Sequence, residues 1–409
     1  MSKSFKPRLR SFENASNQRH IQDKDRFLYK KKNEDPAYRL TIIGVGTMGQ
    51  EHMFVSTLLG KAKIHGIYDK EKHSMDIAES EFKSYASYDI IRYNDLESAC
   101  NDPNTDAIMI CTPNYTHLSV LKIAVKSGKP IFVEKPMATT LADAAEIFHI
   151  SEHYQSFIQI GLQYRFKCQY IEAYHELLNR KVIGDVQTIS MSEYRPPFLD
   201  KVDQWNKFSK NTGGTLVEKC CHYFDLMNLF AGSIPKKIYA TCGKSGVFLD
   251  FKHNNESSDI DDYAFVIIEY DNDIKANFTL NMFSPDFNEE LIVTGAEGRL
   301  IASEKFSFKN NDSSETTFSI QLGENGSSRE SNISYPSIIE KSGHHGATFY
   351  EHVELIKLLK GEKSNSATPI EGLWSIIIAT AAQESMKSGK PVIIEDYLKK
   401  YNLLRVLNL

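Results

Sequence analysis

The sequence contains no apolar run near the roughly 18 residues that a membrane-spanning helix requires, so no transmembrane segment is expected. It also lacks a large excess of either charge, because 48 Lys and Arg residues oppose 53 Asp and Glu residues and the net charge is -5. This near balance argues against a nucleic-acid-binding surface. The chain has 409 residues, 41% of them hydrophobic, which is long enough for two globular domains.

Cysteine is scarce as well, with six residues and no CxxC spacing. Cys220 and Cys221 are neighbours, which is poor geometry for a mutual disulfide or for two ligands of one zinc ion. We therefore predict no metal site. Buried, reduced thiols in a cytoplasmic protein are the expectation.

The first 38 residues lack the apolar segment of a secretory signal, although they are basic. They hold ten Lys and Arg against five Asp and Glu, whereas the rest of the chain is acidic. We predict that residues 1–38 form a basic N-terminal arm that lies on the surface or packs on a partner subunit. A disordered tail without a role is the alternative.

From residue 39 to about residue 160, short apolar segments alternate with segments of helical length. The apolar segments are LTIIG, KIHGIYD, DIIRY, DAIMICT, KPIFVEK and FIQIG. Strands that are apolar throughout, each followed by a helix, are typical of a parallel sheet covered on both faces. We predict an α/β domain with a doubly wound parallel sheet over residues 39–160.

Residues 161–395 have a different pattern and are predicted to form a second, α+β domain. Alternating segments such as YAFVIIEY, KANFTLNM and RLIASE indicate a large, mostly antiparallel sheet. Two late helices, Phe349 to Lys360 and Glu371 to Lys387, are expected to pack back at the domain junction. Residues 396–409 are taken as a C-terminal tail.

A glycine-rich loop, GVGTMG, follows the first predicted strand and opens the first predicted helix. This spacing is that of a dinucleotide-binding loop, in which glycines let the chain turn tightly and approach a pyrophosphate at the helix N-terminus. Asp69 ends the second strand, where a carboxylate binds ribose hydroxyls and repels a 2′-phosphate, so NAD is favoured and NADP is less likely; a turn in a non-binding unit is the alternative. The predicted cofactor residues here are Gly44, Gly46, Thr47, Met48, Gly49, Asp69 and Lys70.

Two further segments, CTPNYTH and EKP, end the fourth and fifth strands, where ligands bind in sheets of this kind. We predict that Lys135 hangs over the cofactor crevice, where partial desolvation would lower its pKa toward neutrality. An ordinary turn and a salt-bridged rim lysine are the structural alternatives. The predicted cofactor residues of these segments are Thr112, Pro113, Asn114, His117, Glu134 and Lys135.

The stretch VEKCCHYFD follows a Gly-Gly pair and lies on a helix predicted from Thr215 to Phe230. On such a helix Glu218 and His222 are four residues apart and share a face, which Lys219 adjoins. An acid, a base and an ammonium together form either a structural charged face or the proton-transfer groups of an active site.

These segments, with VEKPMATT and GLQYRF, stand in the order and spacing of the Gfo/Idh/MocA oxidoreductases, which the sequence resembles over most of residues 39–395. The resemblance implies a Rossmann domain, a bound NAD and hydride transfer from a CH–OH group. It also implies that Lys135 and His222 handle the hydroxyl proton while Glu218 orients or stabilises them, although this family usually has an aspartate at the position of Glu218.

The GLQYRF segment and Lys219 depart in part from the family pattern. Arg165 matches an arginine that the family often uses near the cofactor, whereas Tyr164 replaces a second arginine. Lys219 replaces a small or apolar residue and is predicted to bind an anionic or hydroxyl-rich substrate or to act as a second proton-transfer group. The predicted substrate residues are Tyr164, Arg195, Trp205, Lys219, His222 and His345.

The resulting prediction is an NAD-dependent oxidoreductase that oxidises a ring CH–OH of a sugar, polyol or sugar acid. One alternative is a redox-neutral enzyme that oxidises transiently so that a glycosidic or anhydro bond can be eliminated. Another is a catalytically silent NAD-binding regulatory protein. The resemblance suggests a homodimer or homotetramer formed through the antiparallel sheet.

Overall fold

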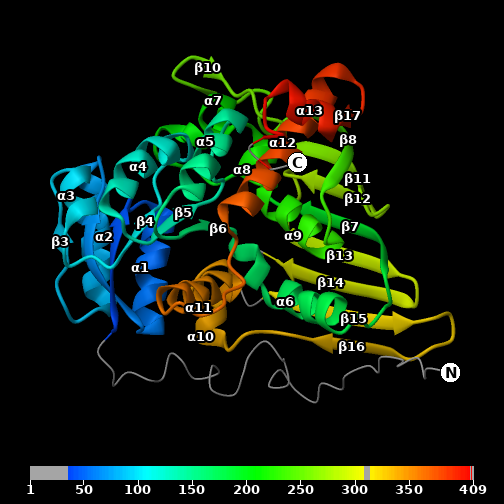
Figure 1. The fold of residues 1–409 in the computed structure, drawn as a ribbon, viewed down its shortest axis with the longest axis horizontal. Coiled ribbons are helices and arrows are strands. Elements are labelled where there is room, and N and C mark those ends of the chain that lie inside the picture. The colour runs from blue at the N-terminus through cyan, green and yellow to red at the C-terminus, as the bar shows by residue number, and fades with distance from the viewer. Residues whose placement is uncertain (1–35, 308–313, 406, 408–409) are drawn as a thin grey trace.

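The protein is described here by a computed structural model of residues 36–307, 314–405 and 407 (Figure 1). Most of the predicted N-terminal arm therefore lies outside the described residues. The first domain contains a six-stranded, all-parallel sheet with the order β3-β2-β1-β4-β5-β6. Its strands are β1 (Tyr38–Ile43), β2 (Ala62–Tyr68), β3 (Ile91–Arg92), β4 (Ala107–Ile110), β5 (Ile131–Glu134) and β6 (Ile158–Gly161).

Helices connect these strands, as the alternating pattern predicts. They are α1 (Thr47–Leu59), α2 (Lys72–Tyr85), α3 (Leu96–Asn101), α4 (His117–Ala124) and α5 (Leu141–Glu152). Ile43 at the end of β1 lies opposite Ile110 of β4, which in turn lies opposite Val133 of β5. The glycine loop and the CTPNYTH and EKP segments therefore start from the same edge of the sheet, at the point where the strand order reverses.

The second domain contains a nine-stranded sheet with the order β16-β15-β14-β13-β7-β12-β11-β8-β17. The pair β7–β12 is parallel and the other pairs are antiparallel, so the prediction of a mostly antiparallel sheet is confirmed. Its strands are β7 (Val186–Tyr194), β8 (Pro235–Gly243), β11 (Tyr263–Tyr270), β12 (Lys275–Asn281), β13 (Phe287–Gly295), β14 (Gly298–Phe306), β15 (Glu315–Leu322), β16 (Ser328–Asn332) and β17 (Val392–Ile393). A small hairpin, β9 (Lys252–His253) with β10 (Glu256–Ser257), lies between β8 and β11.

The helix predicted from Thr215 to Phe230 is in fact two helices, which corrects the geometry of the VEKCCHYFD stretch. Helix α8 (Thr215–Glu218) ends before Lys219, and helix α9 (Cys221–Ala231) begins after Cys220. Glu218 and His222 consequently do not share one continuous helical face. The break leaves the main-chain carbonyl of Glu218 free to accept a hydrogen bond from the Lys135 ammonium over 3.3 Å.

The remaining helices are α6 (Cys168–Tyr174) with a π-helical turn at His175–Asn179, α7 (Ser209–Thr212), α10 (Ser337–Glu340), α11 (Ala347–Leu359), α12 (Pro369–Ser388) and α13 (Ile394–Lys400). Helix α11 packs against α1, and α12 packs against α5 and α9, so both late helices contact helices of the first domain. Residues 396–400 of the predicted tail belong to α13, which packs on β8.

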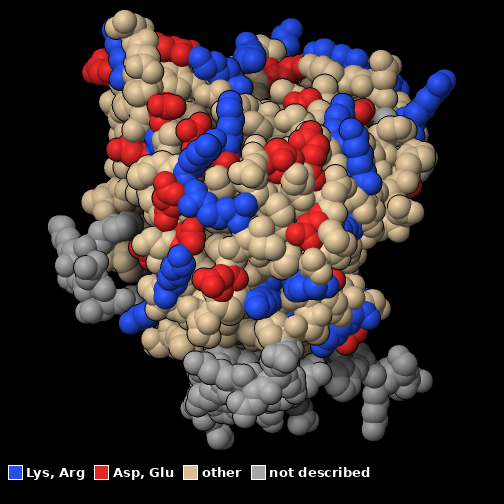
Figure 2. Space-filling model, turned by 90° about the vertical axis from the view of Figure 1, so that its left-hand side faces the viewer, with Lys and Arg blue, Asp and Glu red and all other residues tan. Residues whose placement is uncertain are grey.

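The described part of the chain has no helix long and apolar enough to cross a membrane. Figure 2 shows acidic and basic side chains interspersed on one face of the molecule.

Candidate active site

The glycine loop between β1 and α1 has the conformation of a phosphate-binding turn. Gly44 has a φ of 88°, and a Cβ there would lie 2.7 Å from the main chain of Cys111. A Cβ at Gly49 would lie 2.1 Å from the Gly44 carbonyl oxygen, so this position requires glycine for helix–strand packing. A Cβ at Gly46 would meet nothing within 4 Å. The loop is therefore closed behind Gly44 and Gly49 and open in front of Gly46, where another molecule can approach.

The N-terminus of α1 fits an anionic group. Its N-cap residue, Gly46, has no side chain to satisfy the first main-chain N–H groups, and the first turn contains no acidic residue. Unsatisfied N–H groups at a helix N-terminus bind phosphates. The predicted pyrophosphate position at Gly46, Thr47 and Met48 is consistent with this arrangement and remains a prediction.

Asp69 follows β2 and lies against the glycine loop. One of its carboxylate oxygens accepts a hydrogen bond from the Val45 N–H over 2.8 Å, and the other accepts one from the Glu71 N–H over 2.9 Å. The carboxylate therefore fixes the loop and stands beside it, where the ribose is predicted to bind. Lys70 is exposed.

His117 holds two of the predicted cofactor loops together. Its side chain is fully buried, and its ring nitrogens lie 2.9 Å from the Pro136 carbonyl oxygen and 3.0 Å from the Thr112 carbonyl oxygen. Burial also lowers the pKa of His117. It is thus a link between the loops that follow β4 and β5, and it has no free ring nitrogen for a cofactor.

Lys135 and Glu218 meet at the carboxyl end of β5, across the domain boundary. The ammonium lies 3.9 Å from the Glu218 carboxylate, whose other oxygen accepts a hydrogen bond from the side-chain amide of Asn114. The prediction that the pKa of Lys135 is lowered is wrong. Burial acts to lower this pKa, but the combined attraction of Glu218 and of further groups that include Glu134 outweighs it, and the pKa of Lys135 is raised. Lys135 is therefore a stable ammonium in this arrangement.

His222 lies beside this pair as a buried, neutral imidazole. Burial and the charges of Lys135 and Lys219 hold the pKa of His222 well below its usual value of 6.5. Its Nδ1 is buried and has no hydrogen-bond partner within the described part of the chain. The imidazole stacks on the ring of Tyr164, with ring centroids 4.0 Å apart and an angle of 10° between the planes.

Tyr164 and Lys219, the two departures from the family pattern, contact each other. The Lys219 ammonium donates a hydrogen bond to the Tyr164 hydroxyl over 2.7 Å and lies 3.0 Å from the Glu193 carboxylate. All three side chains are buried. Lys219 thus anchors the ring on which His222 is stacked, instead of pointing freely into the crevice as a second base.

Glu134 points away from the crevice and joins a buried network between the domains. Its carboxylate accepts the Lys135 main-chain N–H over 2.9 Å and lies 2.7 Å from His52 Nε2 on α1. His52 Nδ1 lies 2.8 Å from His352 Nε2 on α11. Glu134, His52 and Glu351 offer ligand atoms within 4.8 Å of one another, but the direct contact between Glu134 and His52 is that of a hydrogen bond. We assign the group as a polar network that supports the backbone of Lys135.

Arg165 forms a buried ion pair within the second domain. Its Nε and one terminal nitrogen lie 2.6 and 2.5 Å from the two carboxylate oxygens of Asp225, and its other terminal nitrogen lies 3.3 Å from Glu371. These contacts join α9 to the N-terminus of α12. A direct contact between Arg165 and the cofactor remains a prediction, and its donors are already engaged.

The structure brings His344 to the site where the sequence suggested His345. The ring of His344 lies 6.4 Å from that of Tyr164, and its Nδ1 lies 2.8 Å from the Glu51 carboxylate. His345 faces the other way, with Nδ1 3.0 Å from the Glu304 carboxylate. Both histidines have positive φ angles, so the loop turns between them and only a structure could show which one faces the site.

The segment between β7 and α7 reaches from the second domain to the first. Trp205 contacts Tyr115 with ring centroids 6.4 Å apart, and Arg195 donates a hydrogen bond from Nε to the Pro196 carbonyl oxygen over 3.1 Å. The same segment contains Lys201, which interacts electrostatically with Lys135 and Glu218. Sequence reasoning missed Lys201 because no motif contains it.

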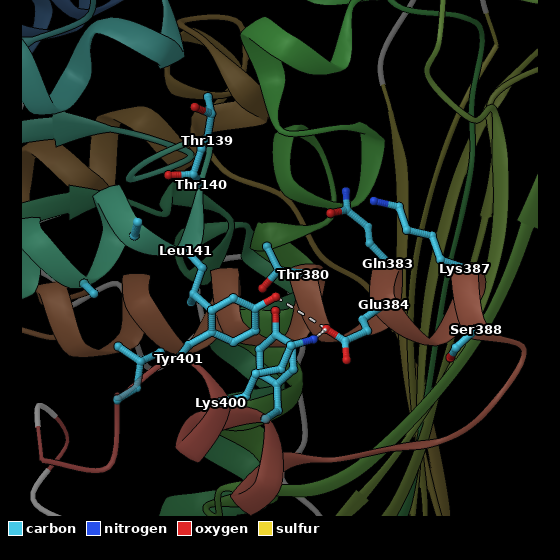
Figure 3. A pocket seen from close by; sticks show the side chains of 14 residues that line it. Thr139, Thr140, Leu141, Thr380, Gln383, Glu384, Lys387, Ser388, Lys400 and Tyr401 are labelled. Atoms are coloured by element: carbon cyan, nitrogen blue, oxygen red, sulfur yellow. Dashed lines mark hydrogen bonds and ion pairs between the residues drawn. The ribbon is translucent and has the colours of Figure 1, made fainter.

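A cavity of about 800 Å³ lies elsewhere, between α5, α12 and α13 (Figure 3). Glu384 lies in its wall, 2.7 Å from the Lys400 ammonium and 3.5 Å from the Tyr401 hydroxyl. None of the predicted site residues lines this cavity. It is therefore separate from the crevice described above.

A glycine loop at the switch point of a parallel sheet, next to a partly buried Lys–Glu–His group from two domains, defines a dinucleotide-binding oxidoreductase of two-domain α/β architecture. Two family profiles agree: "Oxidoreductase family, NAD-binding Rossmann fold" matches residues 38–162, and "Oxidoreductase family, C-terminal alpha/beta domain" matches residues 175–394. The chain belongs to the Gfo/Idh/MocA oxidoreductase family.

Individual relatives are similar over most of their length. The chain is 26% identical to the uncharacterized oxidoreductase YrbE of Bacillus subtilis over 87% of this chain and 96% of that protein. It is 22% identical to the myo-inositol 2-dehydrogenase of Thermotoga maritima over 88% of this chain and 99% of that protein. The structure of a levoglucosan dehydrogenase complexed with NADH and levoglucosan superposes with a TM-score of 0.71 at 17% sequence identity. The superposition covers 87% of this chain and 99% of that one, and it supports the fold.

Proposed function

We propose that the protein is an NAD-dependent dehydrogenase that oxidises a ring CH–OH of a sugar, polyol or sugar acid. The observation that carries this proposal is the meeting of Lys135 from the first domain with Glu218 and His222 from the second, at the sheet edge that bears the glycine loop. Inositol dehydrogenases among the relatives support the class of substrate. Another relative is named for a dihydroxycyclohexadiene that bears a carboxyl group.

The residues have different tasks in this proposal. Bound NAD would accept the hydride. The neutral imidazole of His222 is suited to accept the hydroxyl proton, because burial and nearby cations keep it unprotonated. The Lys135 ammonium is suited to donate a hydrogen bond to the oxygen as it gains negative charge. Glu218 holds Lys135 and Asn114 in place.

We propose NAD rather than NADP as the cofactor, because the Asp69 carboxylate stands beside the glycine loop. The free state of all six cysteines supports a cytoplasmic location. The exposed apolar side chains on strand β11 support an oligomer formed through the second sheet.

The redox-neutral alternative needs an extra base for its elimination step, and Lys219 is the candidate for that base. The Lys219 ammonium is paired with Glu193 and Tyr164, so it is not placed to act as that base. We therefore prefer the dehydrogenase. The experiment that tests the proposal is a screen of sugars, polyols and sugar acids with the purified protein and NAD. Formation of NADH is expected. Product formation without NADH would indicate the redox-neutral enzyme, and NAD binding without any turnover would indicate the silent protein.

A further inference from the structure

The imidazole of His222 lacks the hydrogen bond that usually orients a proton-transferring histidine. Such a histidine is normally fixed by a partner on the ring nitrogen that does not react. Other histidines around the crevice have partners of this kind: the ring nitrogens of His117 lie 2.9 and 3.0 Å from two main-chain carbonyl oxygens, and His344 Nδ1 lies 2.8 Å from the Glu51 carboxylate. The buried Nδ1 of His222 is bonded to none of the described residues. The orientation of its ring therefore has to come from another contact.

The stack between His222 and Tyr164 is such a contact. The two ring centroids are 4.0 Å apart and the ring planes differ by 10°. Tyr164 lies in the short helical turn Gln163–Phe166 after β6, whereas His222 lies in α9, so the stack joins two separate segments of the chain. Both side chains are buried. Parallel rings at this distance restrict each other, because turning one ring would drive its edge into the other.

Tyr164 is the more firmly fixed member of the stack. Its hydroxyl accepts a hydrogen bond from the Lys219 ammonium over 2.7 Å. The Lys167 ammonium lies 4.6 Å from the centroid of its ring, within the range of a cation–π interaction. Lys167 is itself held 2.5 Å from the carboxylates of both Glu289 and Glu304. The tyrosine ring therefore rests on a buried charged network of the second domain.

We propose that Tyr164 is a positioning residue of the active site, whose ring holds the imidazole of His222 in the orientation in which it accepts the hydroxyl proton. This inference rests on the proposed dehydrogenase function and adds a residue that acts through His222. The stack would take the place of the missing hydrogen bond to Nδ1. Because the hydroxyl of Tyr164 is engaged by Lys219 and its ring by His222, the tyrosine needs no direct contact with the substrate.

The kinetic test compares an aromatic replacement with two non-aromatic ones, at saturating NAD and with any sugar or polyol that the wild type oxidises. Tyr164→Phe keeps the ring and loses only the hydroxyl, so it should lose less than about 10-fold in kcat. Tyr164→Leu and Tyr164→Met remove the stack and should lose about 10- to 100-fold in kcat, with KM changed by less than about threefold. Two non-aromatic variants are used because either one can fail to fold, and the result for Tyr164→Phe stands without them.

Tyr270 provides the matched control. It lies in strand β11, is also buried and donates a hydrogen bond from its hydroxyl to Asn228 over 3.0 Å. Tyr270→Phe and Tyr270→Met therefore remove equivalent contacts without touching the stack, and both should keep the wild-type kcat. Equal losses in the Tyr164 and Tyr270 series, wild-type kcat in the non-aromatic Tyr164 variants, or a loss in Tyr164→Phe as large as in Tyr164→Leu would overturn the inference.

Nuclear magnetic resonance of protein with carbon-13 only in its histidines tests the stack without turnover. Ring protons of an imidazole that is stacked on an aromatic ring are shielded by it, so a His222 ring signal should be shifted upfield; its absence from His222→Asn assigns it. The shift should persist in Tyr164→Phe and vanish in Tyr164→Met. An unshifted wild-type signal, or the same shift in Tyr164→Met, would overturn the inference. A shifted signal in a wild type that reduces NAD with no sugar or polyol would support the orientation of His222 and contradict the dehydrogenase.

Discussion

At the scale of single residues, the site separates two groups that sequence reasoning treats alike. The sequence presents Lys135 and His222 as two bases tuned toward neutrality. In the structure their pKa values move apart, because Lys135 gains the carboxylate of Glu218 whereas His222 gains only cations and burial. Two titratable groups whose surroundings push their pKa values apart are typical of an active site in which one group stays protonated and the other acts as the base.

This separation predicts the pH dependence of the oxidation. The pKa of His222 lies below 6.5, so kcat/KM should be constant across neutral pH and fall only as the pH drops below 6.5 and the imidazole is protonated. The pKa of Lys135 lies above 10.5, so no loss from its deprotonation is expected below that pH. A pH series of initial rates with saturating NAD measures this, and His222→Asn should lack the acidic limb. A loss of activity centred above pH 7 that persists in His222→Asn would contradict the assignment.

At the scale of secondary-structure elements, helix α11 connects the second domain to the backbone of Lys135 through buried polar groups. Glu351 on α11 is buried, and its carboxylate has no hydrogen-bond partner among the residues that the structure describes. Burial, together with the charges of Glu134 and Glu51, raises the pKa of Glu351 well above its usual value. A carboxyl group in such surroundings favours its protonated form.

Stability should therefore depend on the protonation of Glu351. Its pKa is raised on folding, so its contribution to stability is complete below the unfolded pKa of about 4.5 and is lost as the pH rises through the folded value. Relative to wild type, Glu351→Gln should gain about 1–3 kcal/mol in the free energy of unfolding between pH 5 and pH 8. Urea unfolding at several pH values measures this. The exposed residue Glu362 provides the control variant Glu362→Gln, and a pH-independent difference between Glu351→Gln and wild type would contradict the prediction.

The sequence predicts most of the first domain because β4, β5 and β6 are almost entirely apolar and buried, and because each motif stands at a strand end. It does less well in the second domain. Strand β7, VQTISMSEY, has few large apolar residues, so its sequence does not predict a strand, although it leads to Arg195. The break between α8 and α9 also has no local sequence signal, because its two residues, Lys219 and Cys220, are neither glycine nor proline. Contacts that cross between the domains, such as those of His344 with Glu51 and of Trp205 with Tyr115, depend on tertiary packing and cannot be derived from spacing.

At the scale of the whole molecule, one face of the second sheet exposes apolar side chains in a regular pattern. Phe265 and Ile267 of β11 are 51% and 50% exposed, and Ile267 lies opposite the exposed Tyr239 of β8. Alternate residues of the same strands are buried under the helices of this domain. An exposed apolar face on a sheet is typical of a subunit interface.

Substitutions that introduce charged residues on this face should therefore dissociate the oligomer into smaller units. Wild type is expected to be a dimer or tetramer in light scattering coupled to gel filtration, and the double variant Phe265→Glu, Ile267→Glu should have a lower mass. Ile77→Glu, at an exposed apolar residue of the first domain, is the control and should keep the wild-type mass. A monomeric wild type, or an unchanged mass for the double variant, would contradict an interface on this sheet.

The most direct measurement of the proposed chemistry is turnover by Lys135→Ala, with NAD affinity measured on the same protein by calorimetry. The account predicts a loss of well over about 100-fold in kcat with NAD affinity largely kept, because the ammonium acts on the substrate oxygen while the glycine loop binds the cofactor. Lys122→Ala, at a surface lysine of the same domain that pairs with Glu146, should turn over at the wild-type rate. Turnover by Lys135→Ala near the wild-type rate would contradict the account.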